Sequence, residues 1–478
     1  MPINAAGYPF AVLAHFAFVL AGLLIYAVGT HMSGQRRHPS AALAWVLTIA
    51  LLPYVGLPLY LVLGTRKFTR QPQGGTLNLP CSDDIPQSGA LSTSKSALIA
   101  TLEGMGLAPP ANNRRVHFHQ DGQMAWDELA ALINNAQLQL DVCTFLLGND
   151  ALAQGVKGLL KERAAAGVNV RLLLDALGSW RTSSADVRGL RAAGVQVQWY
   201  VPLLSNLLRG RGNLRNHRKL VIADGQRLWS GGRNLAGEYF TGKDHQPPWI
   251  DLSFTLEGPL AGQAQNLFDS HWRHTNEPAK SNKHQNAQTP VIRDVNESPI
   301  KHRAQMVPSG PDQAQDTFYG LLLTALFRAE RRVLAVTPYF VPDDSLLTAL
   351  CMAAQRGVQV ELIVPRRSNH RLADIARARA LRDLVAAGGK VSLAPGMVHA
   401  KALVVDDSVA FCGSLNLDSR SLFLNYELML AFYDREDIEA VTHWMDKNFS
   451  GLPGYQPTQP SLLRDVAEGL VRWLGFQI

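Results

Sequence analysis

The chain has few cysteines, and none of them form a C-x-x-C pair. Four occur among 478 residues: Cys81, Cys143, Cys351 and Cys412. This scarcity argues against a disulfide framework or a cysteine-rich zinc site and predicts free thiols. Apolar residues make up 47% of the chain, enough for a sizeable core, and the length predicts two or three domains.

Acidic residues are absent from the first 70 positions. Five basic residues give this segment +5 of the net +7, so the remaining 408 residues are nearly neutral: Arg36, Arg37, Arg66, Lys67 and Arg70. A nucleic-acid-binding protein usually has a strongly basic folded domain. The basic residues here flank apolar runs instead, as lysine and arginine do beside lipid headgroups. We therefore expect no nucleic-acid partner and predict an association with a membrane.

Two long runs, 10–28 and 41–63, lack charged residues. Each is long enough to cross a bilayer as a helix, and Pro53 and Pro58 are tolerable there. The alternatives are a cleaved signal peptide, whose basic start and cleavage site are missing, and two buried core helices. We predict a transmembrane helical hairpin over 1–70. The even spread of basic residues leaves open which membrane face holds the rest of the chain.

Two segments with linker composition, 71–112 and 276–304, precede two stretches that resemble each other, 113–275 and 305–452. In the first stretch we predict strands at 138–146 and 168–175 with a helix at 151–166 between them. In the second we predict strands at 333–339 and 358–364 with a helix at 345–356. The phrases AAAGVNVRLLL and AAQRGVQVELIV are near copies. The pattern predicts an α/β fold of two similar halves, each a mixed sheet flanked by helices, sharing one site.

Each half ends in the same sequence pattern, His-x-Lys-x4-Asp followed by Gly-[Gly/Ser]-x-Asn at identical spacing. One such motif is weak evidence, whereas two with matching tails are strong. The fixed positions are His217, Lys219, Asp224 and Asn234 in the first half, and His399, Lys401, Asp406 and Asn416 in the second.

The pattern suits phosphodiester chemistry. Strand side chains alternate, so the histidine and lysine of each motif are expected on one face. One histidine would attack phosphorus while the other protonates the leaving alcohol. The lysines, Asn234 and Asn416 would hold phosphate oxygens where charge develops. The lysine beside each histidine would repel a divalent cation, so we predict no metal.

Asp224 and Asp406 follow the predicted motif strands. We expect them to brace a tight turn there through local hydrogen bonds. Each half also offers one acid that could orient its catalytic histidine. Asp251 and Glu427 both begin predicted strands after the motifs, and we expect them to orient His217 and His399 respectively. The alternative is that they are exposed acids at strand ends, and Glu238 is a rival in the first half.

At these residues the sequence resembles the phospholipase D superfamily, and within it the bacterial cardiolipin synthases of the two-span membrane type. The resemblance covers nearly the whole chain and is carried by LLLDALGS (172–179), NHRKLVIADGQRLWSGGRNLAGEYF (216–240), WIDLSFTLEGP (249–259), TPYFVPDD (337–344), PGMVHAKALVVDD (395–407) and GSLNLDSRSLFLNYEL (413–428). It implies transfer of a phosphatidyl group between two phosphatidylglycerols with release of glycerol. It also implies a phosphohistidine intermediate, no cofactor, and a multi-pass protein of the bacterial inner membrane. The family habit makes His217 the nucleophile and His399 the acid and base.

Other functions stay open from the sequence. They are a phospholipase D or transferase for another headgroup, a nuclease, and a membrane scaffold without activity. A leucine- and arginine-rich stretch, 203–211, is either a lipid-facing loop or a packed one. The amphipathic tail, 453–478, lies either on the membrane or on the core. The sequence does not fix the oligomeric state.

Overall fold

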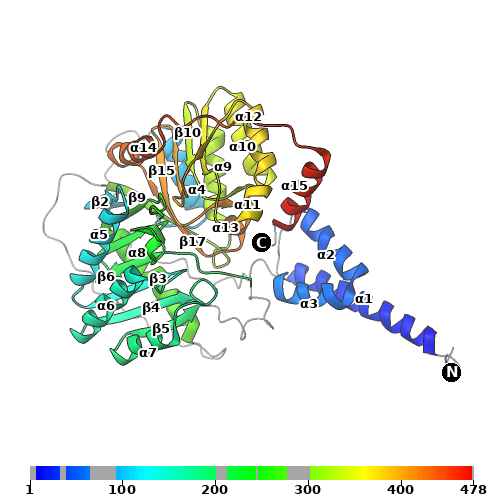
Figure 1. The fold of residues 1–478 in the computed structure, drawn as a ribbon, viewed down its shortest axis with the longest axis horizontal. Coiled ribbons are helices and arrows are strands. Elements are labelled where there is room, and N and C mark those ends of the chain that lie inside the picture. Colours follow the sequence, from blue (N-terminus) through cyan, green and yellow to red (C-terminus); the bar gives the residue numbers. More distant parts are fainter. Residues whose placement is uncertain are drawn as a thin grey trace.

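The computed structural model describes residues 7–32, 39–64, 93–200, 213–243, 246–276 and 302–475. Two α/β halves lie against each other, and three N-terminal helices project to one side (Figure 1). The chain thus has the predicted α/β architecture of two similar halves.

The first half contains a seven-stranded mixed sheet in the order β2-β8-β7-β6-β3-β4-β5. Its strands are β2 (Arg115–Phe118), β3 (Gln139–Thr144), β4 (Asn169–Asp175), β5 (Gln196–Tyr200), β6 (Leu220–Ala223), β7 (Arg227–Gly231) and β8 (Ser253–Glu257). Its helices are α5 (Gly122–Asn134), α6 (Ala151–Ala165), α7 (Ser184–Ala192), the short η2 (Gly237–Tyr239) and α8 (Pro259–Asn276). Alternate residues of β6 enter two different cores, one with α5, α6 and α7 and one with α8.

The second half repeats this order strand for strand and adds β1 at one edge, giving β1-β9-β17-β15-β14-β10-β12-β13. The strands are β1 (Ala111–Asn113), β9 (His302–Ser309), β10 (Arg332–Val336), β12 (Gln359–Pro365), β13 (Lys390–Ala394), β14 (Ala402–Val405), β15 (Val409–Gly413) and β17 (Glu427–Phe432), with a small separate pair, β11 (Phe340–Val341) and β16 (Leu417–Asp418). The helices are α9 (Thr317–Arg328), α10 (Asp344–Gln355), α11 (Arg371–Ala376), α12 (Ala378–Ala386), α13 (Ser419–Phe423), α14 (Arg435–Phe449) and α15 (Leu462–Gly475).

One hydrophobic core joins the two halves. Helices α8 and α14 contribute to it together with strands of both sheets. Phe254 of β8 packs edge-to-face on Phe432 of β17, with ring centroids 5.4 Å apart. Phe118 of β2 packs on the same Phe432 at 5.0 Å. Because the halves share buried aromatic side chains, they form one packed unit.

The predicted strand–helix–strand repeats are confirmed to within a few residues. The units are β3-α6-β4 and β10-α10-β12. Asp150 and Asp343 cap the two helices by accepting backbone N–H groups. Gly167 and Gly357 follow them with φ of +89° and +92°, a conformation that favours glycine. The same local signals therefore build both repeats.

The linker predicted over 71–112 is wrong for residues 93–112. Residues 93–104 form α4 (Thr93–Gly104), which packs on α9 of the second half through buried Leu98 and Leu102. Ala111 begins β1, which pairs with β9. Polar composition led to the linker prediction, yet Leu98, Ile99 and Leu102 follow helical spacing and bury one face of α4. The second predicted linker lies mostly outside the described residues, between the end of α8 and the start of β9.

The N-terminal segment forms α1 (Gly7–Met32), α2 (Pro39–Leu51) and α3 (Pro53–Leu63). The second apolar run was expected to be a single helix, but it is broken at Leu52, directly before Pro53. Tyr26, Trp45, Ile49 and Tyr60 form a small buried cluster between the helices. Over the described ranges, no helix combines the length and apolar character needed to cross a membrane.

Candidate active site

The two histidines lie in extended segments directly ahead of β6 and β14. The expectation that the histidine and lysine belong to a strand is therefore wrong by a few residues, because these strands begin at Leu220 and Ala402. Each segment pairs with the other half instead. His217 donates its backbone N–H to Tyr426 O at 2.9 Å, and His399 donates to Ile250 O at 2.7 Å. The backbone of each half thus holds the histidine of the other.

The acids pair with the histidines across the halves. His217 Nδ1 lies 3.0 Å from Glu427 Oε2, and His399 Nδ1 lies 2.7 Å from Asp251 Oδ2. The expected pairing within each half is wrong: the residues were identified from the sequence, but their partners are exchanged. Both acids are fully buried. In each pair, Nδ1 contacts an acid, which leaves Nε2 as the nitrogen for chemistry.

Burial favours neutral histidines and weakly basic lysines. Burial lowers the pKa of His217 to about 4 and the pKa of His399 to about 3, and nearby lysine charges add to both shifts. Burial likewise lowers the pKa of Lys219 to about 7 and of Lys401 to about 8. An imidazole must be neutral to act as a nucleophile, so these shifts suit covalent chemistry at neutral pH.

The two acids stay ionised despite their burial. Burial alone would raise the pKa of Asp251 and Glu427, but the interaction with the paired histidine, which includes a hydrogen bond to each acid, and the charges of nearby lysines lower both below their usual values. Glu427 also accepts a hydrogen bond from Ser414 Oγ at 2.5 Å. The equivalent residue in the first half is Gly232, where an added Cβ would lie 2.1 Å from Asp251 Oδ1. A larger residue at position 232 would therefore displace the carboxylate of Asp251, whereas serine stabilises the other pair.

Each lysine contacts the histidine of its own motif, Lys401 at the ring and Lys219 at the backbone oxygen. Lys401 Nζ lies 2.8 Å and 3.0 Å from the two ring nitrogens of His399. Lys219 Nζ donates to His217 O at 2.6 Å and lies 5.7 Å from the centre of the Phe145 ring. Two such lysines place positive charge where a phosphate would gain negative charge during the reaction.

Asn234 and Asn416 are buried close to the motifs. The side-chain oxygen of each has no hydrogen-bond partner within the described part of the chain. An unpaired buried acceptor is uncommon in folded proteins. Phosphate oxygens also accept hydrogen bonds, so a contact with phosphate would use the amide N–H groups of these residues. Their expected role in holding phosphate stays a prediction.

Asp224 and Asp406 act at the far ends of β6 and β14, away from the histidines. The local turn bonds expected for them are wrong. Asp224 instead accepts the backbone N–H groups of Gln137, Leu138 and Gln139, ahead of β3. Asp406 accepts those of Glu330, Arg331 and Arg332, ahead of β10. The aspartates therefore tie adjacent strands together. They belong to the same sequence motif as the catalytic histidines and lysines, but they have a structural role and do not contact the substrate.

Aromatic side chains complete the walls around the histidines. Phe145 packs edge-on against His217, and Tyr239 packs edge-on against His399, with ring centroids 5.0 Å and 4.8 Å apart. Trp249 also faces His399 at 5.7 Å. Sequence reasoning missed these residues, although each lies close to a motif or to a predicted strand end. Their apolar surfaces help to exclude water from the site.

A buried arginine between the motif residues joins the halves. Arg218 donates to Glu427 O at 2.9 Å and contacts Asp312 at 3.0 Å. It also lies 2.6 Å from His271 Nε2. Its equivalent in the second motif is Ala400, so the internal repeat gives no signal for this contact.

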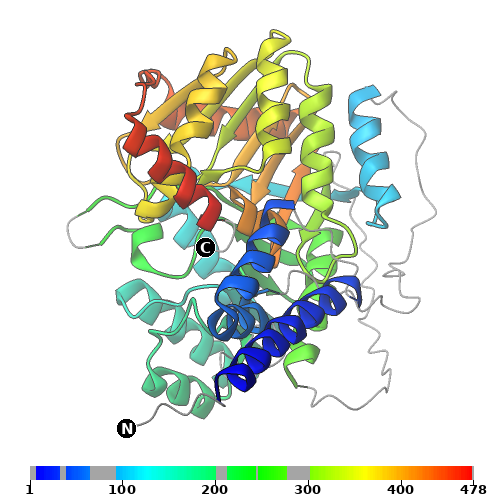
Figure 2. The ribbon, with the colours of Figure 1, turned by 90° about the vertical axis from the view of Figure 1, so that its right-hand side faces the viewer.

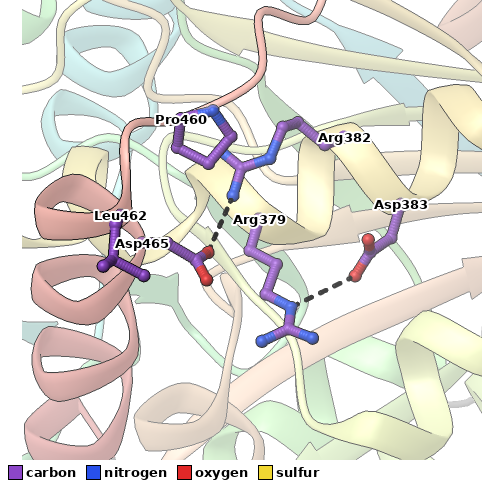
Figure 3. A pocket seen from close by; sticks show the side chains of 6 residues that line it. All are labelled: Arg379, Arg382, Asp383, Pro460, Leu462 and Asp465. Atoms are coloured by element: carbon purple, nitrogen blue, oxygen red, sulfur yellow. Dashed lines mark ion pairs between the residues drawn. The ribbon is translucent and has the colours of Figure 1, made fainter.

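Two other features lie apart from the paired histidines. An open pocket of about 440 Å³ lies between α12 and α15, where Arg379 and Arg382 are paired with Asp383 and Asp465 (Figure 3). Among the described residues, His117, His119 and Glu128 could hold a metal ion. No motif residue belongs to either group, so neither is part of the candidate active site.

The structure describes most of the C-terminal tail predicted at 453–478, but not the leucine- and arginine-rich loop. The loop at 203–211 lies outside the described residues. Helix α15 docks on the second half, where Glu468 pairs with Arg382 at 2.6 Å. Leu462 and Leu463 at its start remain exposed.

Comparison with known proteins covers nearly the whole chain. The family described as "Cardiolipin synthase, PLD-like domain" matches residues 129–272 and 322–452, and "Phospholipase D-nuclease N-terminal" matches 20–64. Cardiolipin synthase A of Pseudomonas putida (strain W619) is 31% identical over 478 residues, covering 98% of this chain and 95% of that protein. Cardiolipin synthase A of Pseudomonas aeruginosa (strain LESB58) is 30% identical, covering 95% and 94%.

A solved structure supports the fold. Phosphatidylserine synthase from Haemophilus influenzae Rd KW20 superposes with a TM-score of 0.60 at 13% identity, covering 80% of this chain and all of that one. At this identity the similarity concerns the fold alone. Because the sequence matches span both halves and nearly the full length of the relatives, the chain belongs to the cardiolipin synthase family of phospholipase D-like phosphatidyltransferases.

Proposed function

We propose that this phosphatidyltransferase moves a phosphatidyl group from one phosphatidylglycerol to another and releases glycerol. The observation that carries the proposal is the pair of buried histidine–acid contacts that cross between the halves. Two histidines in equivalent surroundings suit a reaction with two similar displacements at one phosphorus. The relatives are named for making cardiolipin, and two phosphatidylglycerols can supply its two phosphatidyl groups.

In the first displacement, His217 Nε2 attacks the phosphorus of the donor lipid. The bond from phosphorus to the glycerol oxygen breaks, and His399 gives that oxygen a proton. The bound phosphate anion favours the protonated form of His399, which burial otherwise disfavours. The result is a phosphatidyl group on His217 and free glycerol.

In the second displacement, a hydroxyl of the acceptor lipid attacks the same phosphorus. The phosphorus–nitrogen bond breaks, and His399 takes the proton of the hydroxyl. Lys219, Lys401, Asn234 and Asn416 would hold the non-bridging oxygens in both steps. Glu427 keeps His217 oriented with Nε2 toward phosphorus, and Asp251 does the same for His399.

The N-terminal hairpin would hold the site at the inner membrane of a bacterium. Its helices expose many large apolar side chains, which indicates an apolar partner. They include Val12, Leu13, Phe16, Leu20, Leu24, Leu43, Leu47, Leu51, Leu52 and Tyr54. Helix α15, with its exposed leucines, lies on the side from which the hairpin projects (Figures 1 and 2).

The test supplies labelled phosphatidylglycerol in vesicles and quantifies cardiolipin, phosphatidic acid and glycerol. We expect cardiolipin and glycerol in equal amounts. His217→Ala should abolish the covalent lipid adduct, whereas His399→Ala should retain it but turn over slowly. His443→Ala, an exposed histidine of α14, is the control. Phosphatidic acid as the main product would identify a phospholipase D, and cardiolipin formed only with phosphatidylethanolamine would change the second substrate.

A further inference from the structure

The internal symmetry of the active site is broken by charge. Arg215 lies two residues before His217, in the segment whose backbone pairs with Tyr426 of the second half. The equivalent of Arg215 in the second half is Met397. Arg420 lies four residues after Asn416, and the residue four after Asn234 is Glu238. Two arginines thus occur on the His217 side, where the His399 side has a methionine and a glutamate.

Specific contacts bring the two arginines together. The Arg420 guanidinium donates to Asn213 Oδ1 at 3.0 Å and to Asn213 O at 2.8 Å, two residues before Arg215. Tyr426 donates its backbone N–H to Arg215 O at 2.8 Å. Each half therefore contributes one arginine, and hydrogen bonds between the halves hold the segments that carry them.

The surroundings of the pair favour an additional anion. Arg215 is 7% exposed, and Arg420 is half-buried. Burial lowers the pKa of Arg420, and repulsion from Arg215 lowers it further. The carboxylates of Asp418, Asp175 and Glu427 lie nearby, and their attraction partly offsets the lowering of the Arg420 pKa. Two guanidinium groups that repel each other gain from a phosphate placed between them.

We propose that Arg215 and Arg420 bind the phosphate of the acceptor lipid while the reacting phosphate lies between the histidines. This inference rests on the proposed function. The product of that reaction has two phosphates joined by one glycerol, so the acceptor phosphate must lie close to the reacting phosphorus. An arginine pair beside His217 meets this requirement, and the planar guanidinium suits phosphate oxygens.

The test is a competition between two acceptors for the same intermediate. Wild-type protein receives labelled phosphatidylglycerol vesicles with 1-butanol, an alcohol without a phosphate. The measured quantity is the ratio of cardiolipin to phosphatidylbutanol. We expect this ratio to fall about tenfold or more in Arg420→Gln and in Arg215→Gln, because each loses charge-assisted hydrogen bonds to phosphate. Arg420→Lys should show a smaller fall, since it keeps the charge but loses the paired donors.

Arg435→Gln is the matched control, since Arg435 is an exposed arginine of α14, and its ratio should equal that of wild type. If both products fall together in the Gln variants and the ratio is unchanged, the arginines do not select the acceptor and the inference is wrong. If the Gln variants misfold, Arg420→Lys still tests the inference. A ratio of cardiolipin to phosphatidylbutanol equal to that of wild type in Arg420→Lys would overturn it. If wild-type protein forms no transfer product at all, the proposed function fails first.

Discussion

Glu427 of the second half lies 3.0 Å from Nδ1 of His217 in the first half. The reciprocal contact, between Asp251 and His399, is 2.7 Å. Each motif histidine therefore takes its acid from the other half.

Removal of the charge of either acid should disable the histidine of the other half. We expect Glu427→Gln and Asp251→Asn each to reduce kcat by about 10²- to 10⁴-fold, because the histidine loses both its orientation and the stabilisation of its cation. The measurement is turnover of labelled phosphatidylglycerol by variants that melt like wild type. Glu436→Gln, an exposed acid on α14, should behave normally. Near-normal turnover in either acid variant would show that the pairs do not matter for chemistry.

The lysines should set the alkaline side of the pH profile. The pKa values of Lys219 and Lys401 lie at about 7 and about 8 because both are buried. Only the protonated forms stabilise phosphate, and these are lost as the pH rises through those values. We therefore expect kcat/KM to fall above about pH 7 to 8. Arginine stays protonated, so Lys219→Arg should move the fall to higher pH if it retains activity; a profile that stays flat to pH 10 in wild type would contradict the assignment.

Asp406 should matter for stability more than for chemistry. Its carboxylate accepts three backbone N–H groups, at 2.8 to 3.0 Å. Asn tolerates the positive φ of this residue but lacks the charge, so Asp406→Asn should cost about 1.5–3 kcal/mol in the free energy of unfolding. Asp407→Asn is the neighbouring control, since its ion pairs with Arg331 and Arg332 are exposed and contribute under about 1 kcal/mol. Equal melting temperatures for the two variants would contradict this role.

Transfer should not depend on a divalent metal. Lys401 Nζ lies within 3.0 Å of both ring nitrogens of His399, where it would repel a cation. We expect full activity after exhaustive dialysis against EDTA. Loss of activity that one specific divalent ion restores would contradict the proposed mechanism.

Deletion of residues 1–70 should change the product ratio. At a membrane surface the acceptor lipid is concentrated and water is partly excluded. Without the hairpin we expect more phosphatidic acid relative to cardiolipin when both proteins consume the same amount of donor. An unchanged ratio would mean that the hairpin only tethers the enzyme.

Local signals were sufficient to predict much of the fold. The glycines at 167 and 357 and the apolar strands beside them gave both repeats to within a few residues. Helix α4 was missed because its segment is rich in serine, threonine and alanine, and its apolar face is recognised only against α9. The helix at 93–104 is therefore stabilised by tertiary packing more than by local helix propensity.

Site residues were easier to find than their partners. His217, His399, Asp251 and Glu427 were identified because the motif repeats and each acid was predicted to begin a strand. Glu427 does begin β17, and Asp251 lies two residues before β8. The exchange of partners depends on how the two sheets dock, and no local pattern reports that geometry. Arg218 shows the same limit, because its contacts with His271 and Asp312 are with residues far away in the chain.

The crossed pairs also have a consequence for biosynthesis. A ribosome that has completed only the first half has made His217 and Asp251, but neither Glu427 nor His399. We therefore expect the nascent chain to be inactive until the last strands fold onto the first half. The order of synthesis alone would thus keep the enzyme inactive until translation is nearly complete. Two separately expressed halves should likewise be inert alone and regain turnover on mixing.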